Sequence, residues 1–265
     1  MISGISEKNR RLLDELNRDR KGPFSIKEAS STLNIPLEKA RLLLSYFARK
    51  GWLSRVRRGL YITVPLGTVN PQTYKENSWV VANSVFSPCY IGGWSAAEHW
   101  EFTDQVFNSV VIFSTRRTRH KRTIIKATEY IVKFVSADLF GKTKSVWVSN
   151  SKIQVSDPSQ TIVDILDDPS IGGGMRHVSE IVMAYFDSEY REDSAVYNYI
   201  KDKRNKTIYK RLGYLIEILN IDAADLREKC RINISKGYSS LDPAVKIKGI
   251  FSRGWNLRIN VNIEK

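Results

Sequence analysis

Apolar residues in the first quarter of the chain recur first with the period of a helix and then with the alternation of a strand. Ser25 and Glu28 have the spacing of a capping box, which predicts a helix from about 27 to 33. Asn34-Ile35-Pro36 should end this helix, because proline cannot continue a helix but suits the first position of a new one. A second helix is therefore expected after a tight turn.

This second helix is predicted over residues 36–50 and ends at Gly51, the residue type that best tolerates the left-handed conformation after a helix. In a helix-turn-helix the second helix enters the major groove of DNA, and its N-terminal half reaches the base edges. Lys39 and Arg41 are therefore candidates for base or phosphate contacts. The residues expected on its buried stripe are Ala40, Leu43, Leu44 and Phe47. Those expected to face outward are Glu38, Lys39, Arg41, Leu42, Ser45 and Arg49.

A basic β-hairpin is predicted next, with strands at 52–56 and 60–64. Its three-residue turn is Arg57-Arg58-Gly59, whose glycine can supply the positive φ that such a loop needs. The side chains expected to pack the hairpin onto the helices are Trp52, Leu60 and Tyr61.

These elements together predict a winged helix-turn-helix, so double-stranded DNA is the first expected partner. Arginines at the hairpin tip can lie along a phosphate backbone or enter a minor groove. The residues expected to contact DNA are Ser25, Lys27, Lys39, Arg41, Ser45, Arg49, Arg55, Arg57 and Arg58.

The fold class expected for the whole chain is α+β, with this N-terminal domain followed by a larger mixed α/β domain. An amphipathic helix over 6–19 completes the N-terminal core. The proline and glycine content after the hairpin predicts a linker. The expected divisions are residues 1–66 for the winged helix-turn-helix, 67–75 for the linker and 76–265 for the α/β domain.

The larger domain is expected to mix strands and helices. Residues 89–100 are expected to form a glycine-bearing loop that leads into a short helix capped by Ser95. Strands are predicted at 109–114, 129–135 and 255–261, and one bent strand or a hairpin at 145–155. Helices are predicted at 74–86, 161–166, 175–186, 193–203 and 208–219.

The chain carries a net charge of +14 and has a pI near 9.7, which favours a polyanionic partner. Residues 1–65 hold fourteen Lys and Arg against six Asp and Glu, so they contribute +8 of this charge. Two further basic runs either are solvated surface or extend the contact with DNA or a protein partner. Their residues are Arg116, Arg117, Arg119, Lys121, Arg122, Lys201, Lys203, Arg204 and Lys206.

The sequence gives little indication of a cofactor or metal. Cys89 and Cys230 have neither CxxC spacing nor a paired histidine, which argues against a zinc site and a disulfide framework. Asp164, Asp167 and Asp168 are better explained as an acidic cluster at a helix end than as a metal site. Without a signal-like or membrane-spanning apolar run, we expect a cytoplasmic protein that does not engage a membrane.

Several segments in order resemble the AbiEi family, the antitoxins of bacterial type IV toxin–antitoxin systems linked to abortive phage infection. They are RGLYI at 58–62, CYIGGWSAAEHW at 89–100, VSDPSQTIVD at 155–164, LDP at 241–243 and WNLRINV at 255–261. The resemblance implies a non-enzymatic protein whose N-terminal domain binds inverted repeats in its own promoter. It also implies that the C-terminal domain counteracts a cognate nucleotidyltransferase-like toxin, with or without direct contact.

Two other functions remain open from the sequence. A DNA-targeted nuclease would need clustered carboxylates and a lysine on adjacent strands to hold Mg²⁺, but Glu129 and Lys133 lack the usual spacing. A ligand-responsive regulator would find support in the aromatic residues of the 90–100 segment, although core packing also explains them.

Overall fold

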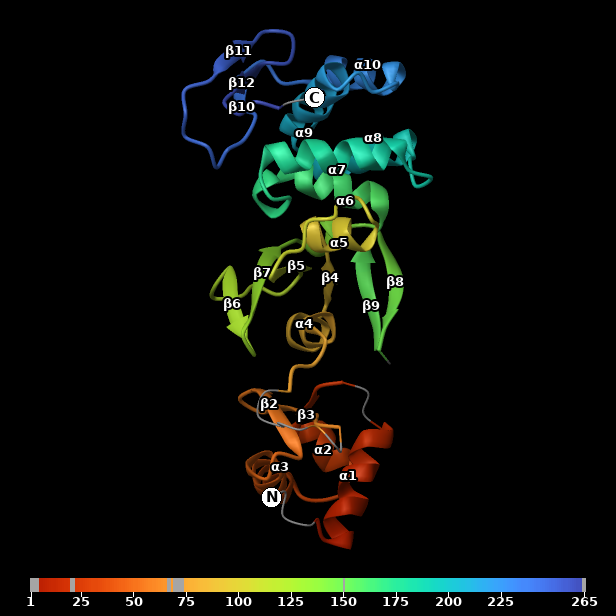
Figure 1. The fold of residues 1–265 in the computed structure, drawn as a ribbon, viewed down its shortest axis with the longest axis vertical. Coiled ribbons are helices and arrows are strands. Elements are labelled where there is room, and N and C mark those ends of the chain that lie inside the picture. The colour runs from red at the N-terminus through yellow and green to blue at the C-terminus, as the bar shows by residue number, and fades with distance from the viewer. Residues whose placement is uncertain (1–4, 20–21, 66–67, 69–73, 150, 264–265) are drawn as a thin grey trace.

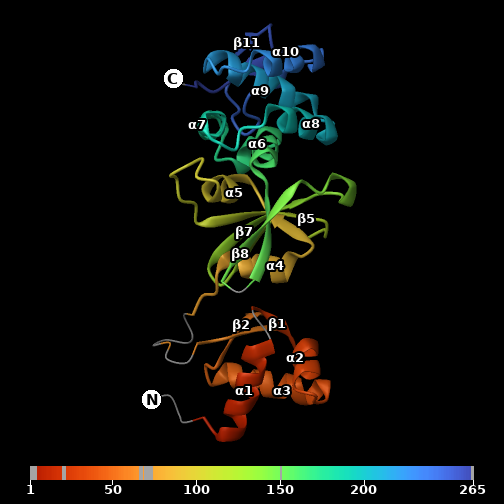
Figure 2. The same ribbon diagram turned by 90° about the vertical axis from the view of Figure 1, so that its right-hand side faces the viewer.

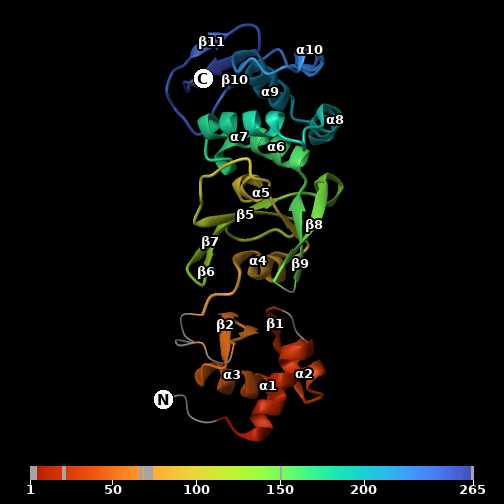
Figure 3. The same ribbon diagram turned by 45° about the vertical axis from the view of Figure 1, so that its right-hand side comes forward.

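The protein is elongated, and its layers follow one another along the long axis (Figure 1). This computed structural model describes residues 5–19, 22–65, 68, 74–149 and 151–263. Helices and a small sheet form the N-terminal end, a larger sheet lies in the middle, and a helical layer with a second small sheet forms the opposite end (Figures 1 and 3). Most of the expected linker, 67–75, lies outside the described residues.

The N-terminal region packs three helices against a small sheet whose strand order is β1-β3-β2. Its core contains Leu16, Leu44, Phe47, Trp52 and Tyr61. Strand β1 was not expected; it pairs antiparallel with β3 and joins the start of α2 to the hairpin. The elements are α1 (Glu7–Asp19), β1 (Phe24–Ser25), α2 (Ile26–Thr32), α3 (Leu37–Arg49), β2 (Leu53–Arg57) and β3 (Leu60–Thr63).

Local side-chain chemistry fixes the boundaries of α2 and α3. The Glu28 backbone N–H donates to Ser25 Oγ at 3.2 Å, and the Ser25 N–H donates to Glu28 Oε2 at 2.8 Å, which confirms the capping box. Asn34 has a φ of 48° in the turn between the helices, and Gly51 has a φ of 78° after α3, as expected. Pro36 precedes the first helical residue of α3 rather than occupying it.

The hairpin turn is shorter than expected. Arg57 pairs with Leu60 across the strands, so only Arg58 and Gly59 connect them. An irregularity between Arg55 and Arg57 takes up the additional residue as a bulge. Gly59 still has a positive φ of 78°.

The two faces of the hairpin pack in opposite directions because successive strand residues point to opposite sides. Trp52 and Tyr61 pack onto the N-terminal helices, as expected. The prediction for Leu60 was wrong, because its side chain lies in a second apolar cluster with Val80 of α4 (Ser78–Phe86). Val56 and Ile62 belong to the same cluster, so one hairpin face contributes to the core of the middle layer.

The middle layer is a mixed sheet in the order β6-β7-β5-β4-β9-β8. β5 runs parallel to β7 and β4 parallel to β9, whereas the other neighbouring pairs are antiparallel. Helix α4 covers the face nearer the N-terminal region, and α5 covers the face nearer the helical layer (Figure 2). The elements are β4 (Cys89–Ile91), α5 (Gly93–His99), β5 (Ser109–Ser114), β6 (Arg122–Ile125), β7 (Thr128–Phe134), β8 (Thr143–Val148) and β9 (Ser151–Ser156).

Several details of this sheet differ from the expectation. Residues 89–91 form a fully buried central strand instead of a loop. Ser95 lies inside α5, where its Oγ accepts the Val111 N–H at 3.1 Å, so it does not cap the helix. The basic turn after β5 leads into β6, a strand that was not expected. The hairpin alternative for 145–155 is confirmed by the antiparallel pairing of β8 with β9.

The helical layer forms the largest apolar cluster and ends in a small sheet of order β10-β12-β11. Four of its helices were expected; α10 was not. The elements are η2 (Ala137–Leu139), α6 (Pro158–Asp167), η3 (Pro169–Ile171), α7 (Met175–Asp187), α8 (Asp193–Lys203), α9 (Lys206–Ile218), α10 (Ala224–Asn233), β10 (Ser239–Ser240), β11 (Ile250–Ser252) and β12 (Leu257–Ile259).

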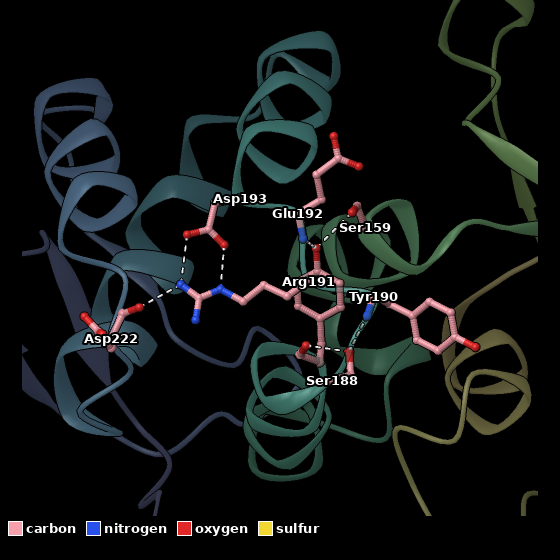
Figure 4. A network of polar contacts seen from close by, with 8 residues as sticks. Ser159, Ser188, Tyr190, Arg191, Glu192, Asp193 and Asp222 are labelled. Atoms are coloured by element: carbon pink, nitrogen blue, oxygen red, sulfur yellow. Dashed lines mark hydrogen bonds and ion pairs between the residues drawn. The ribbon is translucent and has the colours of Figure 1, made fainter.

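A polar network fixes the connection between α7 and α8 (Figure 4). The Arg191 guanidinium binds both carboxylate oxygens of Asp193 at 2.9 and 3.0 Å and donates to the Asp222 carbonyl at 2.6 Å. The Tyr185 hydroxyl accepts the Glu192 N–H at 2.8 Å and lies 2.9 Å from Ser159 Oγ. These contacts tie three helices together at one junction. Among the described residues, none of the helices has both the length and the apolar character required to cross a membrane.

Candidate nucleic-acid interface

The outward side of α3 is a basic surface with one large apolar residue. Lys39, Arg41 and Arg49 are exposed, and Ser45 is half-buried. Leu42 is 71% exposed among these polar side chains. The sequence placed Leu42 on the outward side of the helix, but Leu42 was not included among the residues expected to bind DNA. Its exposure makes it a further candidate, because an apolar side chain there can contact a thymine methyl group.

Arg41 forms a weak ion pair on this surface. Its guanidinium lies 3.2 Å from the Glu38 carboxylate, and the two side chains are 55% and 73% exposed. An exposed pair of this kind contributes only about 0–1 kcal/mol, so Arg41 can exchange Glu38 for a phosphate or a base edge at little cost. Helix spacing places Glu38, Arg41, Leu42, Ser45 and Arg49 along one side of α3.

The start of α2 presents an exposed lysine and a serine hydroxyl that already accepts a hydrogen bond. Lys27 is exposed. Ser25 Oγ already accepts a hydrogen bond in the capping box, so its first role is to fix the start of α2. Its hydroxyl proton remains able to donate to a phosphate oxygen.

The hairpin presents three exposed arginines, Arg55, Arg57 and Arg58. Gly59 would place an added Cβ in open space, with no atom of the described residues within 4 Å, and its carbonyl accepts the Ile26 N–H at 3.3 Å, so the tip is open on one side and held at the start of α2 on the other. α3 leads directly into β2 and contacts it, so the helix and the hairpin are neighbours (Figure 3). This arrangement suits a helix in a groove and a hairpin along the flanking backbone.

The first of the two additional basic runs is an exposed surface on the middle layer. Arg116, Arg119 and Lys121 are exposed in the loop between β5 and β6. Arg122 lies 3.0 Å from Glu129 on the neighbouring strand, and the Arg117 guanidinium lies 4.6 Å from the centre of the Phe134 ring.

The second run does not form one surface. Lys201, Arg204 and Lys206 are exposed, but Lys203 is 10% exposed and its Nζ lies 2.7 Å from Asp164 Oδ1. The inclusion of Lys203 in a surface patch was therefore wrong, because α8 turns this residue toward α6. Burial lowers the pKa of Lys203, but the adjacent Asp164 carboxylate outweighs burial and raises this pKa above its ordinary value.

The three aspartates at the end of α6 bind different partners instead of converging. Asp164 also accepts hydrogen bonds from Gln160 Nε2 at 2.7 Å and Tyr90 Oη at 3.1 Å. Asp167 accepts from Asn205 Nδ2 at 2.7 Å, and Asp168 forms an ion pair with Lys133. Within the described part of the chain, no group of three or more Cys, His, Asp and Glu residues could hold a metal ion.

The residues considered for the other two functions also have structural partners. Glu129 binds Arg122, and Lys133 binds Asp168, so neither is directed to a shared metal position. Tyr90 and Trp94 are buried against Phe113 and Phe107, with ring centres 4.8 and 4.5 Å apart. These two aromatic residues are core residues, and Trp100 is partly buried. Cys89 and Cys230 are buried free thiols.

Comparison with known proteins bears on the same segment of the chain. Residues 11–64 match the model of a family described as "Transcriptional regulator, AbiEi antitoxin". A search of curated proteins finds no match. The resemblance inferred from sequence is therefore confirmed for the segment that runs from α1 to the hairpin, and this segment is similar to an antitoxin-type transcription regulator.

Proposed function

We propose that this protein is a DNA-binding autorepressor and an antitoxin. In this proposal residues 1–66 form a winged helix-turn-helix that binds inverted repeats in its own promoter. Residues 76–265 form the domain that counteracts a cognate nucleotidyltransferase-like toxin of a type IV, phage-defence system. No catalytic role is assigned to the chain.

One observation supports the proposed DNA-binding role. The segment that matches the regulator family presents the basic outward side of α3 beside a hairpin with three exposed arginines. Lys39 and Arg41 lie in the N-terminal half of α3, which is the part of a recognition helix that reaches base edges. Arg55, Arg57 and Arg58 supply positive charge for the phosphates on either side.

The test uses the full-length protein and a duplex with the sequence upstream of its own gene. Fluorescence anisotropy should show tighter binding to this duplex than to a scrambled duplex of equal length, and a promoter–reporter fusion should be repressed. Equal affinity for the two duplexes, together with an unrepressed reporter, would count against autorepression.

Replacing Arg41 by alanine is expected to weaken binding to the promoter duplex by about 1–3 kcal/mol, because a side chain that reads a base contributes roughly this much discrimination. Binding to the scrambled duplex should change much less. Arg227→Ala removes an exposed arginine from α10 and serves as the control. Equal losses on both duplexes would show that Arg41 contacts phosphate rather than a base.

The antitoxin part needs variants that leave the middle layer intact. Deletion of residues 1–66 would remove Val56, Leu60 and Ile62 from the apolar cluster that they share with α4. Point substitutions on the exposed DNA-binding surface avoid this problem. In cells that express a neighbouring nucleotidyltransferase-like gene, a variant that no longer represses the reporter should still restore growth. Joint loss of repression and protection in a folded variant would contradict separate roles for the two domains.

A further inference from the structure

Four large apolar side chains on and near β11 are exposed, and β11 lies at the end of the protein opposite the N-terminal region (Figure 1). They lie on β11 and on the segments near it: Tyr238, Ile247, Ile250 and Phe251, with exposed fractions of 50%, 69%, 79% and 63%. The Tyr238 and Phe251 rings meet at 4.8 Å between their centres. We call these four residues the β11 surface.

Strand β11 is at the edge of its sheet. It pairs antiparallel with β12, and in the described part of the chain no strand pairs with its other side. An edge strand presents backbone N–H and C=O groups that can pair with an added strand. Exposed apolar side chains and this unpaired backbone edge therefore lie on the same strand.

Both faces of β11 carry an exposed apolar side chain that an added strand could contact. Ile250 is paired with Ile259, which packs against the large apolar cluster. Ile250 therefore lies on the same face of the sheet as Ile259, but its own side chain is exposed. Phe251 is paired with Arg258 on the opposite face and packs against Tyr238. A strand added beside β11 could cover the exposed side of Ile250 and contact Phe251.

The charged residues near the β11 surface indicate the charge expected of a partner. Between residues 235 and 258 the exposed charged side chains are all cations: Lys236, Lys246, Lys248, Arg253 and Arg258. The sole carboxylate in that stretch, Asp242, is 3% exposed and accepts the Met175 and Ala244 N–H groups at 2.8 Å. A segment with acidic side chains would be attracted to this surface, and a basic one repelled.

We propose that β11 is a docking strand for an acidic partner protein, which adds an extended segment of alternating acidic and apolar side chains to this edge. Apolar contacts and backbone pairing favour a protein over a nucleic acid, whose contacts with a protein are mainly with its phosphates. The β11 surface lies at the far end of the long axis from α3, so the partner can bind while the N-terminal region holds DNA (Figure 2). This inference goes beyond the proposed function and is tested without DNA.

The probe is a short fluorescein-labelled peptide in which glutamate and valine alternate, titrated with the full-length protein in anisotropy measurements. Saturable binding is expected. The double variant Ile250→Ser/Phe251→Ser should weaken it at least about tenfold, because central apolar contacts carry much of the energy of an interface. Ile124→Ser is the matched control, since Ile124 is 74% exposed on β6, an edge strand of another sheet. Circular dichroism checks that both variants are folded.

A second peptide, N-methylated at every residue, has no backbone N–H groups on either edge, so it cannot pair as a strand and should bind at least about tenfold more weakly. Equal binding of the two peptides would indicate electrostatic adsorption and would overturn the proposal that β11 is a docking strand. Unchanged binding by the double variant, or no saturable binding at all, would also overturn it. Loss of duplex DNA binding in the double variant would assign the surface to nucleic acid. A dimer in sedimentation velocity that the double variant abolishes would assign it to a second copy of the chain.

Discussion

Replacing Lys203 by methionine is expected to lower the free energy of unfolding of the region beyond the hairpin by about 3–5 kcal/mol. The Asp164 side chain is fully buried, and Lys203 Nζ, 2.7 Å from Asp164 Oδ1, is its cationic partner. Methionine keeps most of the apolar stem of the lysine but leaves the carboxylate with Gln160 and Tyr90 as its side-chain hydrogen-bond donors among the described residues. An unpaired buried charge is strongly destabilising.

Urea unfolding followed by tryptophan fluorescence and circular dichroism measures this change. Lys201→Met, on the exposed side of the same helix, should change stability by less than about 0.5 kcal/mol. The double variant Asp164→Leu/Lys203→Met should recover most of the loss, because it removes both charges. Equal stability of the Lys203→Met and Lys201→Met variants would contradict a buried ion pair.

The same variant also separates the two proposed roles. The core of the N-terminal region contains residues of α1–α3 and the hairpin and is distinct from the cluster around α6, α7 and α9. At temperatures where the Lys203→Met variant is partly unfolded, we expect toxin counteraction to fall before promoter binding does.

Most of the N-terminal candidate interface could be predicted from the sequence because its signals are local. A capping box, a proline break and a glycine after a helix each act within a few residues, and the structure reproduces all three. The exposure of Lys39, Arg41 and Arg49 follows from the same helical period. Leu60 was misjudged because strand alternation shows that Leu60 and Tyr61 face opposite sides, but not which neighbour covers each side.

Features of the larger region that depend on distant contacts could not be predicted. Lys201 and Lys203 look equivalent in the sequence, and only the packing of α8 on α6 separates an exposed cation from a buried one. The strand at 89–91 is too short to show a period, and it is a strand because β5 and β9 pair with it on both sides. Ser95 resembled a helix cap, but its hydroxyl serves the backbone of β5.

Replacing Arg57 and Arg58 together by alanine is expected to weaken binding to promoter and scrambled duplexes alike. If each arginine neutralises one phosphate, the slope of log affinity against log salt becomes shallower by about 1.8, which corresponds to roughly a 60-fold loss at 0.1 M salt. Both side chains are exposed and belong to neither apolar cluster that the hairpin joins, so the variant should remain folded. Anisotropy titrations over a range of salt concentrations give the slope.

The matched control is Arg119→Ala/Lys121→Ala, which removes the same charge from the exposed turn before β6. If DNA contacts only the N-terminal region, the control keeps the original slope, and the hairpin variant alone changes it. If both variants make the slope shallower, the middle layer shares the duplex with the hairpin. A hairpin variant with an unchanged slope would place Arg57 and Arg58 away from phosphate, because loss of a phosphate contact must appear in the salt dependence.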